Sequence, residues 1–547
     1  MNSKEKIWSG FLIGILIALV CLYFAGILWI NVNARVWFNF DLYADAKLAQ
    51  IISQTNSLFP EGWTFGNQFY IIATPVISAL ICNVISDPAA ALGIASSVMT
   101  VILMSSFLWC IWPFVKKENI PASLFCFIGG ILISNGAATD FSGIQIFFTM
   151  GSYYACYLFG ILLTMGIWLR IQEGLKVRAV YVILCYFVNI ALGMQSLREM
   201  LSLNLPLCAL SIYFVLRDYL QKKRIVIPKT TRFSLVCLWW CAFGIGTMSV
   251  LKRMPVIQQN DILTFAETSF LDSVTGSINA LAQYIGLIPD WSCVFGCFSF
   301  FAALALTAAV LFSVIYILIT DDRSAVACMI LFCAISIAAV FCAGIFVIVL
   351  RDIYFFVWHL LATLCITYLL ERFSSRMNLK RAVLLILSAI GTINLYFSFA
   401  ADIQMYREKE SFYREISDTL ISDGITHVYY NIWGMNDAAR IAASSEDRLL
   451  FCAVTPNFTE AESNADHADL LAPISYLCYD EWYSEEADVS AYLCLNGTLL
   501  ESGENQEYYR MLQDHVTLTH RFVNGGEDYC FYAFDKELYQ DIIHADS

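Results

Sequence analysis

The sequence predicts an α-helical polytopic membrane protein with about 11 transmembrane helices and a C-terminal α/β domain. The first observation is composition: 59% of the residues are hydrophobic and 14% are charged, which excludes an ordinary soluble enzyme. The second is that apolar segments close to the length of a bilayer crossing recur up to residue 400. The third is a change of character after residue 401, where the tail carries a net charge of about −20 and the rest of the chain about +6.

The expected crossings alternate with connections whose basic residues fall on one side. They are residues 7–30, 89–113, 120–135, 149–169, 179–196, 203–217, 232–250, 293–319, 325–349, 354–370 and 382–400. Clusters such as Lys116–Lys117 and Arg372–Arg381 then lie in the cytoplasm by the positive-inside bias. This alternation requires that residues 69–86, a short segment with Pro75, form an interfacial or half-inserted helix. The N-terminus is therefore expected inside the cell and the C-terminal domain outside.

We expect two domains, a transmembrane domain over residues 1–401 and an acidic extracytoplasmic α/β domain over 402–547. Two outer connections are long. Residues 31–88 should contain interfacial helices, and residues 251–292 either bind or gate a ligand or passively cover the bundle.

The tail begins with a charged helical stretch after residue 401. Residues 426–435 and 448–454 follow as strands around a helix at 436–447, the order of a βαβ unit. Four cysteines of the tail could form two disulfides in an oxidising compartment: Cys452, Cys478, Cys494 and Cys530.

The first outer connection holds two acids, Asp41 and Asp45, four residues apart. A helix through them places both carboxylates on one face. At the mouth of a helical bundle such acids can act as a general base or bind a hard cation. The alternative is a solvated amphipathic helix on the membrane surface. Asp45 is the preferred base, because Asp41 directly follows Phe40 and could instead cap the helix.

Further charged residues lie near membrane depth at the same face, where each charge costs free energy. They are Asp140, Arg198, Glu199, Arg351 and Asp352. Arg198 and Arg351 could converge on a phosphate, which a guanidinium binds through two hydrogen bonds. Alternatively, each arginine is neutralised by the acid next to it in the sequence. His359 is predicted to be a buried, hydrogen-bonded histidine.

These features together resemble the GT-C glycosyltransferases, in particular the protein O-mannosyltransferases, the aminoarabinose transferases of the lipid A pathway and uncharacterised bacterial members. The residues that carry the resemblance are DLYADAKLAQIISQTNSLFPEGW, Asp140, QSLREMLSLNLPL and RDIYFFVWHL. Asp45 takes the place of the aspartate in the Asp-Glu pair of those families, with Ala46 where the second acid would stand. Asp140 corresponds to their acid in the second outer loop. Arg351 followed by Tyr354 is similar to their Arg-Tyr pattern.

The resemblance implies transfer of a sugar from a polyprenyl-phosphate donor to a cell-surface glycan, lipid or protein on the outer face of the membrane. The outer-face charges and the lack of cytoplasmic domains indicate a bacterial plasma membrane. Asp45, Asp41 and Asp140 would be the catalytic acids, and Arg351 and Arg198 would bind the donor phosphate. A divalent cation, if one is used, would be held by Asp45 and Asp140. Membrane lipid is a further expected partner, and the acidic tail argues against nucleic acid.

Two other function classes remain open from the sequence. One is a transporter or flippase of a lipid-linked or anionic substrate, although no inverted repeat is visible. The other is a catalytically inactive assembly protein.

Overall fold

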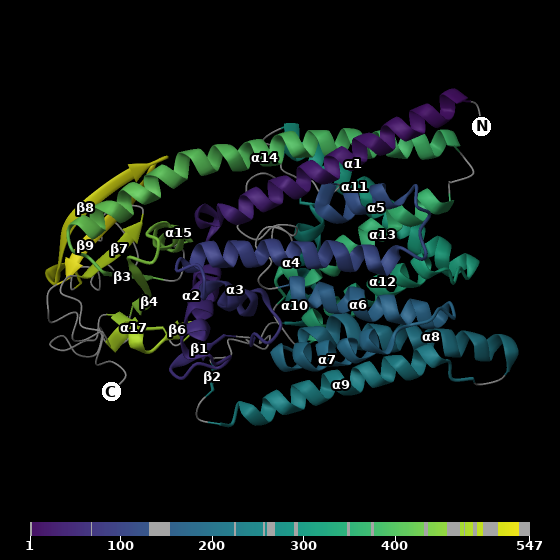
Figure 1. Cartoon of the computed structure of the whole chain (residues 1–547), viewed down its shortest axis with the longest axis horizontal. Coiled ribbons are helices and arrows are strands. Elements are labelled where there is room, and N and C mark those ends of the chain that lie inside the picture. Colours follow the sequence, from purple (N-terminus) through teal and green to yellow (C-terminus); the bar gives the residue numbers. More distant parts are fainter. Residues whose placement is uncertain are drawn as a thin grey trace.

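A bundle of long helices with a sheet-containing domain at one end makes up the computed structural model (Figure 1). It describes residues 3–534 except for the following positions: 67, 131–153, 224–225, 255–256, 260–268, 289–290, 292–293, 347–349, 373–376, 432–435, 457–470, 475, 485–489 and 496–511. The start of α1 and the C-terminal end of α8 lie at the end opposite to the sheet. The helices of the bundle and its outer connections, in chain order, are α1 (Ser3–Val32), η1 (Ala34–Trp37), α2 (Phe40–Thr55), α3 (Thr74–Cys82), α4 (Pro88–Ile111), α5 (Ile120–Phe125), η2 (Cys126–Gly130), α6 (Ala155–Gln172), α7 (Ala179–Gln195), η4 (Met200–Asn204), α8 (Leu205–Lys222), α9 (Lys229–Leu251), α10 (Phe270–Ile285), α11 (Val294–Thr320), α12 (Ala325–Phe346), η5 (Asp352–Phe355), α13 (Val357–Arg372) and α14 (Met377–Ser422).

The predicted polytopic helical fold is confirmed. Within the described ranges, eight helices are long and apolar enough to cross a membrane: α1, α4, α6, α8, α9, α11, α12 and α13. Residues 120–129 and α7 form two shorter apolar helices, and the predicted crossing at 382–400 lies inside α14. Each of the eleven predicted segments thus overlaps a helix, and parts of residues 120–135, 149–169, 293–319 and 325–349 lie outside the described residues.

The segment expected to be interfacial, residues 69–86, contains the short helix α3. Its nine residues correspond to about 14 Å of helix, well short of a hydrocarbon core of about 30 Å. Pro75 stands in the first turn of α3, where its missing N–H costs no helical hydrogen bond. Length alone therefore prevents α3 from spanning a bilayer.

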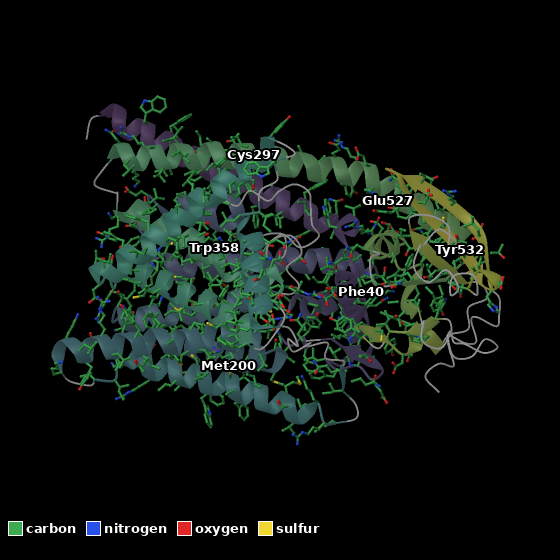
Figure 2. All side chains as sticks on the ribbon, turned by 180° about the vertical axis from the view of Figure 1, so that it is seen from behind. Phe40, Met200, Cys297, Trp358, Glu527 and Tyr532 are labelled. Atoms are coloured by element: carbon green, nitrogen blue, oxygen red, sulfur yellow. The ribbon has the colours of Figure 1, made fainter. Side chains whose placement is uncertain are left out.

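Helix α2, which carries Asp41 and Asp45, is buried in the protein over most of its length. Its residues from Leu42 to Ala49 are all buried, because α3 and α4 pack on one side and helix α15 of the tail (Asn436–Ser444) packs on the other. Figure 2 shows Phe40, at the start of α2, between the bundle around Trp358 and the sheet around Tyr532. The alternative of a solvated amphipathic helix was wrong, because the tail covers this helix.

The predicted βαβ unit of the tail is confirmed. Strand β3 (His427–Asn431) is followed by α15 and by β4 (Leu450–Pro456), which pairs with β3 in parallel. The full sheet has six strands in the order β5-β4-β3-β7-β9-β8, and the remaining strands are β5 (Leu471–Pro473), β7 (Ser490–Leu495), β8 (Val516–Asn524) and β9 (Glu527–Phe534). The register pairs Cys494 with Cys530 across β7 and β9. Helix α14 continues unbroken past residue 401, and its end packs on α15 through residues such as Tyr413 and Ile416.

A second, small sheet joins three distant parts of the chain. Strand β1 (Trp63–Phe65) of the first outer connection pairs in parallel with β2 (Gln258–Gln259) of the long loop. On its other edge it pairs antiparallel with β6 (Cys478–Tyr479) of the tail. The Gln259 Nε2 donates to the carbonyl oxygen of Gly66 at 2.8 Å, just beyond the end of β1. We call this three-stranded sheet the clasp.

Ion pairs and hydrogen bonds also join the tail to α2. Lys47, 7% exposed, forms an ion pair with Asp447, and Gln50 Nε2 donates to the same carboxylate at 2.6 Å. The backbone N–H of Phe451 in β4 donates to the hydroxyl of Tyr43 at 3.2 Å. The tail is therefore fixed against the segment that carries the candidate acids.

Candidate active site

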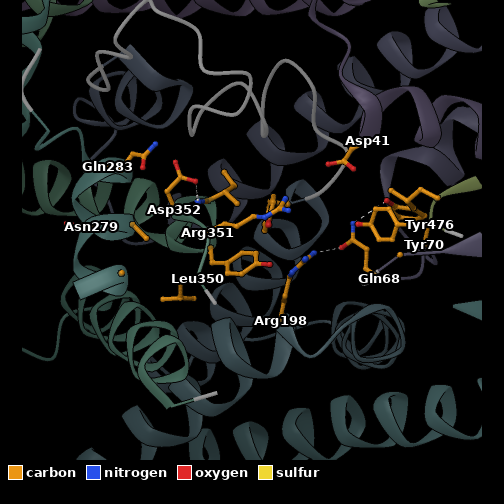
Figure 3. Close-up of a pocket in the computed structure, with 17 residues that line it drawn as sticks. Asp41, Gln68, Tyr70, Arg198, Asn279, Gln283, Leu350, Arg351, Asp352 and Tyr476 are labelled. Atoms are coloured by element: carbon orange, nitrogen blue, oxygen red, sulfur yellow. Dashed lines mark hydrogen bonds between the residues drawn. The ribbon is translucent and has the colours of Figure 1, made fainter. Parts of the chain in front are cut away.

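A cavity of about 400 Å³ lies where the helical bundle, the first outer connection, α10 and the tail meet (Figure 3). Its lining is Asp41, Gly66, Gln68, Tyr70, Tyr154, Arg198, Gly276, Asn279, Ala280, Gln283, Leu350, Arg351, Asp352, Ile353, Tyr354, Tyr476 and Leu477. In Figure 3 the two arginines lie in the middle, Asn279, Gln283 and Asp352 lie on one side, and Asp41 and Tyr476 lie on the other. The fold thus brings together three residues predicted from the sequence: Asp41, Arg198 and Arg351.

Arg198 lies in the turn between α7 and η4 and is held from several sides. Its Nη1 donates to Oε1 of Gln68 at 2.5 Å. The rings of Tyr154 and Tyr354 each lie 5.3 Å from its Cζ, within the range of cation–π attraction. Glu199, 0% exposed, lies on the opposite side, with Oε1 only 2.9 Å from where a Cβ on Gly160 of α6 would stand. Arg198 and Glu199 are therefore not a neutralised pair.

Arg351 lies at the mouth of the cavity, just before η5. Its side chain is exposed, and it forms no ion pair with any residue in the described part of the chain. Asp352 instead accepts a hydrogen bond from the backbone N–H of Ile353 at 2.8 Å. A guanidinium that faces a cavity without a carboxylate partner is suited to bind an anion.

Asp41 and Asp45 differ in what they face. Asp41 is partly exposed and lines the cavity, whereas Asp45 is 1% exposed and does not line it. The two carboxylates are one helical turn apart, but among the residues of α2 only Asp41, in the first turn, lines the cavity. The N-cap of α2 is Asn39, whose side chain accepts from the N–H of Leu42 at 2.9 Å, so the capping role suggested for Asp41 was wrong.

Behind the cavity wall Asp45 is linked to Tyr70. Burial raises the pKa of the Tyr70 phenol well above its ordinary value, and the nearby charge of Asp45 raises the pKa further. Gln68 Nε2 donates to the same phenol at 3.3 Å. Tyr70 therefore stays a neutral phenol between a buried carboxylate and the cavity.

The tail contributes Tyr476 and Leu477 to the cavity. The ring of Tyr476 lies against Gly66, where an added Cβ would stand 2.7 Å from Cε2. Burial and the nearby charge of Asp41 raise the pKa of Tyr476, while Arg351 and Arg198 act in the opposite direction. Two residues later the chain enters β6 of the clasp, so the clasp fixes where Tyr476 stands.

Several lining residues were not predicted from the sequence. Gln68, Tyr70 and Tyr476 carry no motif. Asn279 and Gln283 had a weak signal, because they lie in the long loop expected to bind or gate a ligand, and their i, i+4 spacing puts both on the cavity face of α10.

Asp140 lies outside the described residues, so its predicted role is still a prediction. In the part of the chain that the structure describes, no group of three or more histidine, cysteine, aspartate or glutamate side chains is arranged to hold a metal ion. His359 is 0% exposed, and its Nε2 lies 2.6 Å from the carbonyl oxygen of Phe127, as expected for a buried, hydrogen-bonded histidine.

A second cavity, of about 440 Å³, adjoins the first and is mostly apolar. Its walls include Met194, Leu197, Leu201, Ile245, Met248 and Val340. Four residues line both cavities: Tyr154, Arg198, Leu350 and Tyr354. Arg198 therefore stands between a polar space and an apolar space within the helices.

Comparisons with known proteins give a likeness to solved structures. No family model and no curated protein sequence matches the chain. Among solved structures, the crystal structure of ArnT from Cupriavidus metallidurans bound to undecaprenyl phosphate is similar over 97% of this chain and 99% of that chain, with 10% sequence identity and a TM-score of 0.44.

Proposed function

We propose that this protein is a membrane glycosyltransferase that moves a sugar from a polyprenyl-phosphate donor to a glycan, lipid or protein acceptor. The observation that supports it best is the junction of the two cavities at Arg198. A polyprenyl-phosphate sugar has the same three parts in the same order: an apolar chain, a phosphate and a polar ring. The apolar cavity suits the chain, the two arginines suit the phosphate, and the polar cavity has room for a sugar.

The chemistry follows from the groups that face the polar cavity. Asp41 takes the proton of an acceptor hydroxyl, whose oxygen attacks the anomeric carbon. The bond from that carbon to the phosphate oxygen breaks with inversion, and the phosphate departs with the bonding electron pair. Arg198 and Arg351 stabilise the negative charge that develops on the leaving group. The amides of Asn279 and Gln283 can donate to and accept from sugar hydroxyls.

Asp41 replaces Asp45 as the proposed base because a base must reach the proton that it removes. Asp41 lines the cavity and Asp45 lies behind Tyr70. Asp45 is assigned a supporting role in the next subsection.

We propose that the cavity opens at the outer face of a bacterial plasma membrane, with the N-terminus inside the cell. The basic clusters support this orientation, since Arg372 ends α13, whose other end follows the cavity residues of η5, and Lys116 pairs with the adjacent Glu371. Protease added to intact cells without an outer barrier should then remove the tail after about residue 422, where α14 ends. Protection of the tail until the membrane is lysed would reverse the orientation.

The experiment that tests the function uses the purified full chain in lipid nanodiscs. A polyprenyl-phosphate sugar pool is added together with membranes of the source cells as acceptor, and the release of free polyprenyl phosphate is measured. Release that depends on both donor and acceptor is the expected result. In a parallel liposome assay, donor that crosses the bilayer without release would instead identify a flippase. Neither release nor movement would support an inactive assembly protein.

A further inference from the structure

A chain of hydrogen bonds runs from the cavity to Tyr70, close to Asp45 of α2. Arg198 Nη1 donates to Gln68 Oε1 at 2.5 Å, and Gln68 Nε2 donates to the Tyr70 hydroxyl at 3.3 Å. The charge of Asp45 acts on that hydroxyl. Gln68 is 6% exposed, Tyr70 is 2% exposed and Asp45 is 1% exposed. Every group in the chain except Arg198 is thus withdrawn from solvent.

The donors in this chain all point the same way, and this fixes the orientation of the amide. Gln68 presents its carbonyl to the guanidinium, which has only donors, and its NH₂ to the phenol oxygen. The phenol oxygen thus accepts from Gln68 and keeps its own proton. A flipped amide would put an NH₂ group against the guanidinium. Tyr157 adds a second donor to Gln68 Oε1, at 3.4 Å.

The backbone around Gln68 is fixed as well. The N–H groups of Ile71 and Ile72 donate to Oε1 of Gln195 at 2.8 and 2.7 Å, and the N–H of Phe69 donates to the carbonyl oxygen of Gln195 at 3.1 Å. Gln195 ends α7, three residues before Arg198. The same turn of chain therefore holds both Gln68 and Arg198, and their relative position does not depend on long flexible connections.

We infer that Gln68 is a positioning residue that aims the Arg198 guanidinium at the donor phosphate, with Tyr70 and Asp45 as its support. This inference rests on the proposed function. It gives the buried aspartate of α2 a role that does not require contact with substrate. It also explains how Arg198 keeps one orientation without a carboxylate partner, which would compete with the phosphate for the guanidinium.

The test compares two ligands that differ only in the phosphate: undecaprenyl phosphate and undecaprenol. Binding of each to the purified full chain in nanodiscs is measured for the wild type and for Gln68→Met, which keeps the length of the side chain and removes the amide. The wild type should prefer the phosphate. Gln68→Met should bind undecaprenyl phosphate about tenfold more weakly, as expected for a lost hydrogen bond to a charged group, and should bind undecaprenol as before.

Two further variants make the result specific. In an Arg198→Ala background, Gln68→Met should cause no additional loss of the phosphate preference, because the two residues act as one unit. Gln259→Met is the matched control: this glutamine bonds the backbone of the same loop at Gly66 but does not touch Arg198. It should keep the full preference for the phosphate.

The outcomes separate the inference from the function on which it rests. A wild type without any preference for the phosphate would contradict the proposed function. A wild type with the preference, lost in Arg198→Ala but kept in Gln68→Met, would contradict the positioning role alone. Equal weakening of both ligands in Gln68→Met would show that Gln68 only supports the fold, and would also overturn the inference.

Discussion

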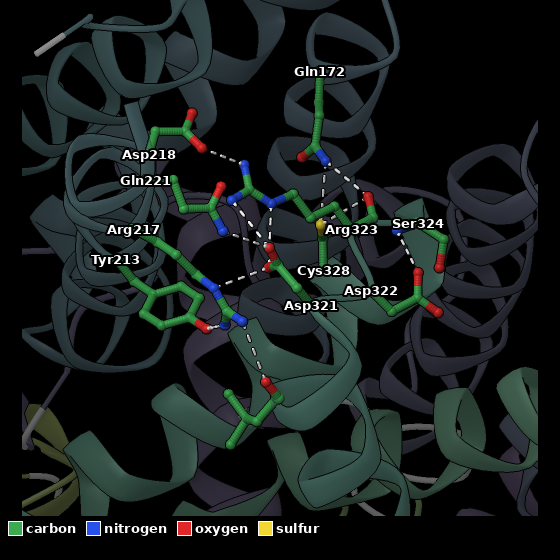
Figure 4. A network of polar contacts seen from close by, with 11 residues as sticks. Gln172, Tyr213, Arg217, Asp218, Gln221, Asp321, Asp322, Arg323, Ser324 and Cys328 are labelled. Carbon is green, nitrogen blue, oxygen red and sulfur yellow. Dashed lines mark hydrogen bonds and ion pairs between the residues drawn. The ribbon is translucent and has the colours of Figure 1, made fainter. Parts of the chain in front are cut away.

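The two ends of helix α8 lead into two polar clusters that use their arginines differently. At its C-terminal end, Arg217 and Arg323 share Asp321, and Arg323 also contacts Asp218 at 2.8 Å (Figure 4). Arg372 of α13 is paired in the same region with Asp322, at 2.6 Å. We call this group the paired cluster. At the other end of α8, Arg198 and Arg351 face the cavity without a carboxylate partner among the described residues.

The difference separates two reasons for placing charge at the end of a membrane helix. In the paired cluster each guanidinium forms an ion pair with an aspartate of the protein. These ion pairs join α8, α11 and α13, and the guanidinium groups are not available to bind a ligand. In the cavity the same chemical group is held by neutral partners, an amide and two aromatic rings, and its charge stays available. Composition alone cannot distinguish the two ends, because both contain arginines beside aspartates.

The largest effect should come from the base in the cavity. Asp41→Asn should lower transfer by about 10²–10⁴-fold, the usual contribution of a general base, while the protein stays folded, since Asn39 and not Asp41 caps α2. The measurement is release of polyprenyl phosphate in the nanodisc assay, with thermal unfolding as the check on folding. Asp45→Asn should act mainly on binding of undecaprenyl phosphate. If Asp45→Asn abolishes transfer and Asp41→Asn is mild, then Asp45 is the base and Tyr70 must carry the proton to it.

The second largest effect should come from Arg351, which forms no ion pair with a described residue. Arg351→Ala should weaken binding of undecaprenyl phosphate by about 1.5–3 kcal/mol, the range for hydrogen bonds to charged groups. Arg351→Lys should recover only part of this loss, because an ammonium keeps the charge but not the planar fork. Undecaprenol binding serves as the control and should not change. Unchanged phosphate binding in Arg351→Ala would make Arg351 a surface residue of the helix start.

The contact between Tyr476 of the tail and Gly66 of the cavity wall can be tested by adding a methyl group at Gly66. Gly66→Ala places a methyl group 2.7 Å from the Tyr476 ring, so the ring must move, at a cost of about 1–3 kcal/mol for an overpacked site. Both transfer activity and the unfolding temperature should fall. Gly276→Ala is the control for stability, since an added Cβ there meets no atom within 4 Å and α10 gains a better helix former. Equal stability of the two variants would mean that Tyr476 adapts without cost.

The smallest effect should come from the paired cluster. Arg323→Ala removes contacts that are about one-third exposed, with 32% exposure for Arg323 and 29% for Asp218. Such pairs contribute up to about 1 kcal/mol, so the unfolding temperature should fall slightly. Binding of undecaprenyl phosphate should be unchanged. A loss of binding comparable to that of Arg351→Ala would show that the two ends of α8 do not have separate roles.

The sequence by itself determined the helices, the βαβ unit of the tail and the two arginines of the site. The helices follow from apolar length, since about 20 apolar residues span a bilayer whatever their neighbours are. The order of β3, α15 and β4 follows from local periodicity, which depends on nearby residues only. Arg198 and Arg351 stood out because charge near membrane depth is costly and needs a reason.

Only the tertiary structure decided which acid faces the cavity and which residues support the arginines. Asp41 and Asp45 share a helix, so no local pattern could tell which one a distant surface would cover. Gln68 meets Arg198 across 130 positions of the chain, and Tyr476 reaches the cavity through a clasp of three segments. The role of a neutral amide or phenol depends on which residues it contacts. The packing of the whole chain decides those contacts.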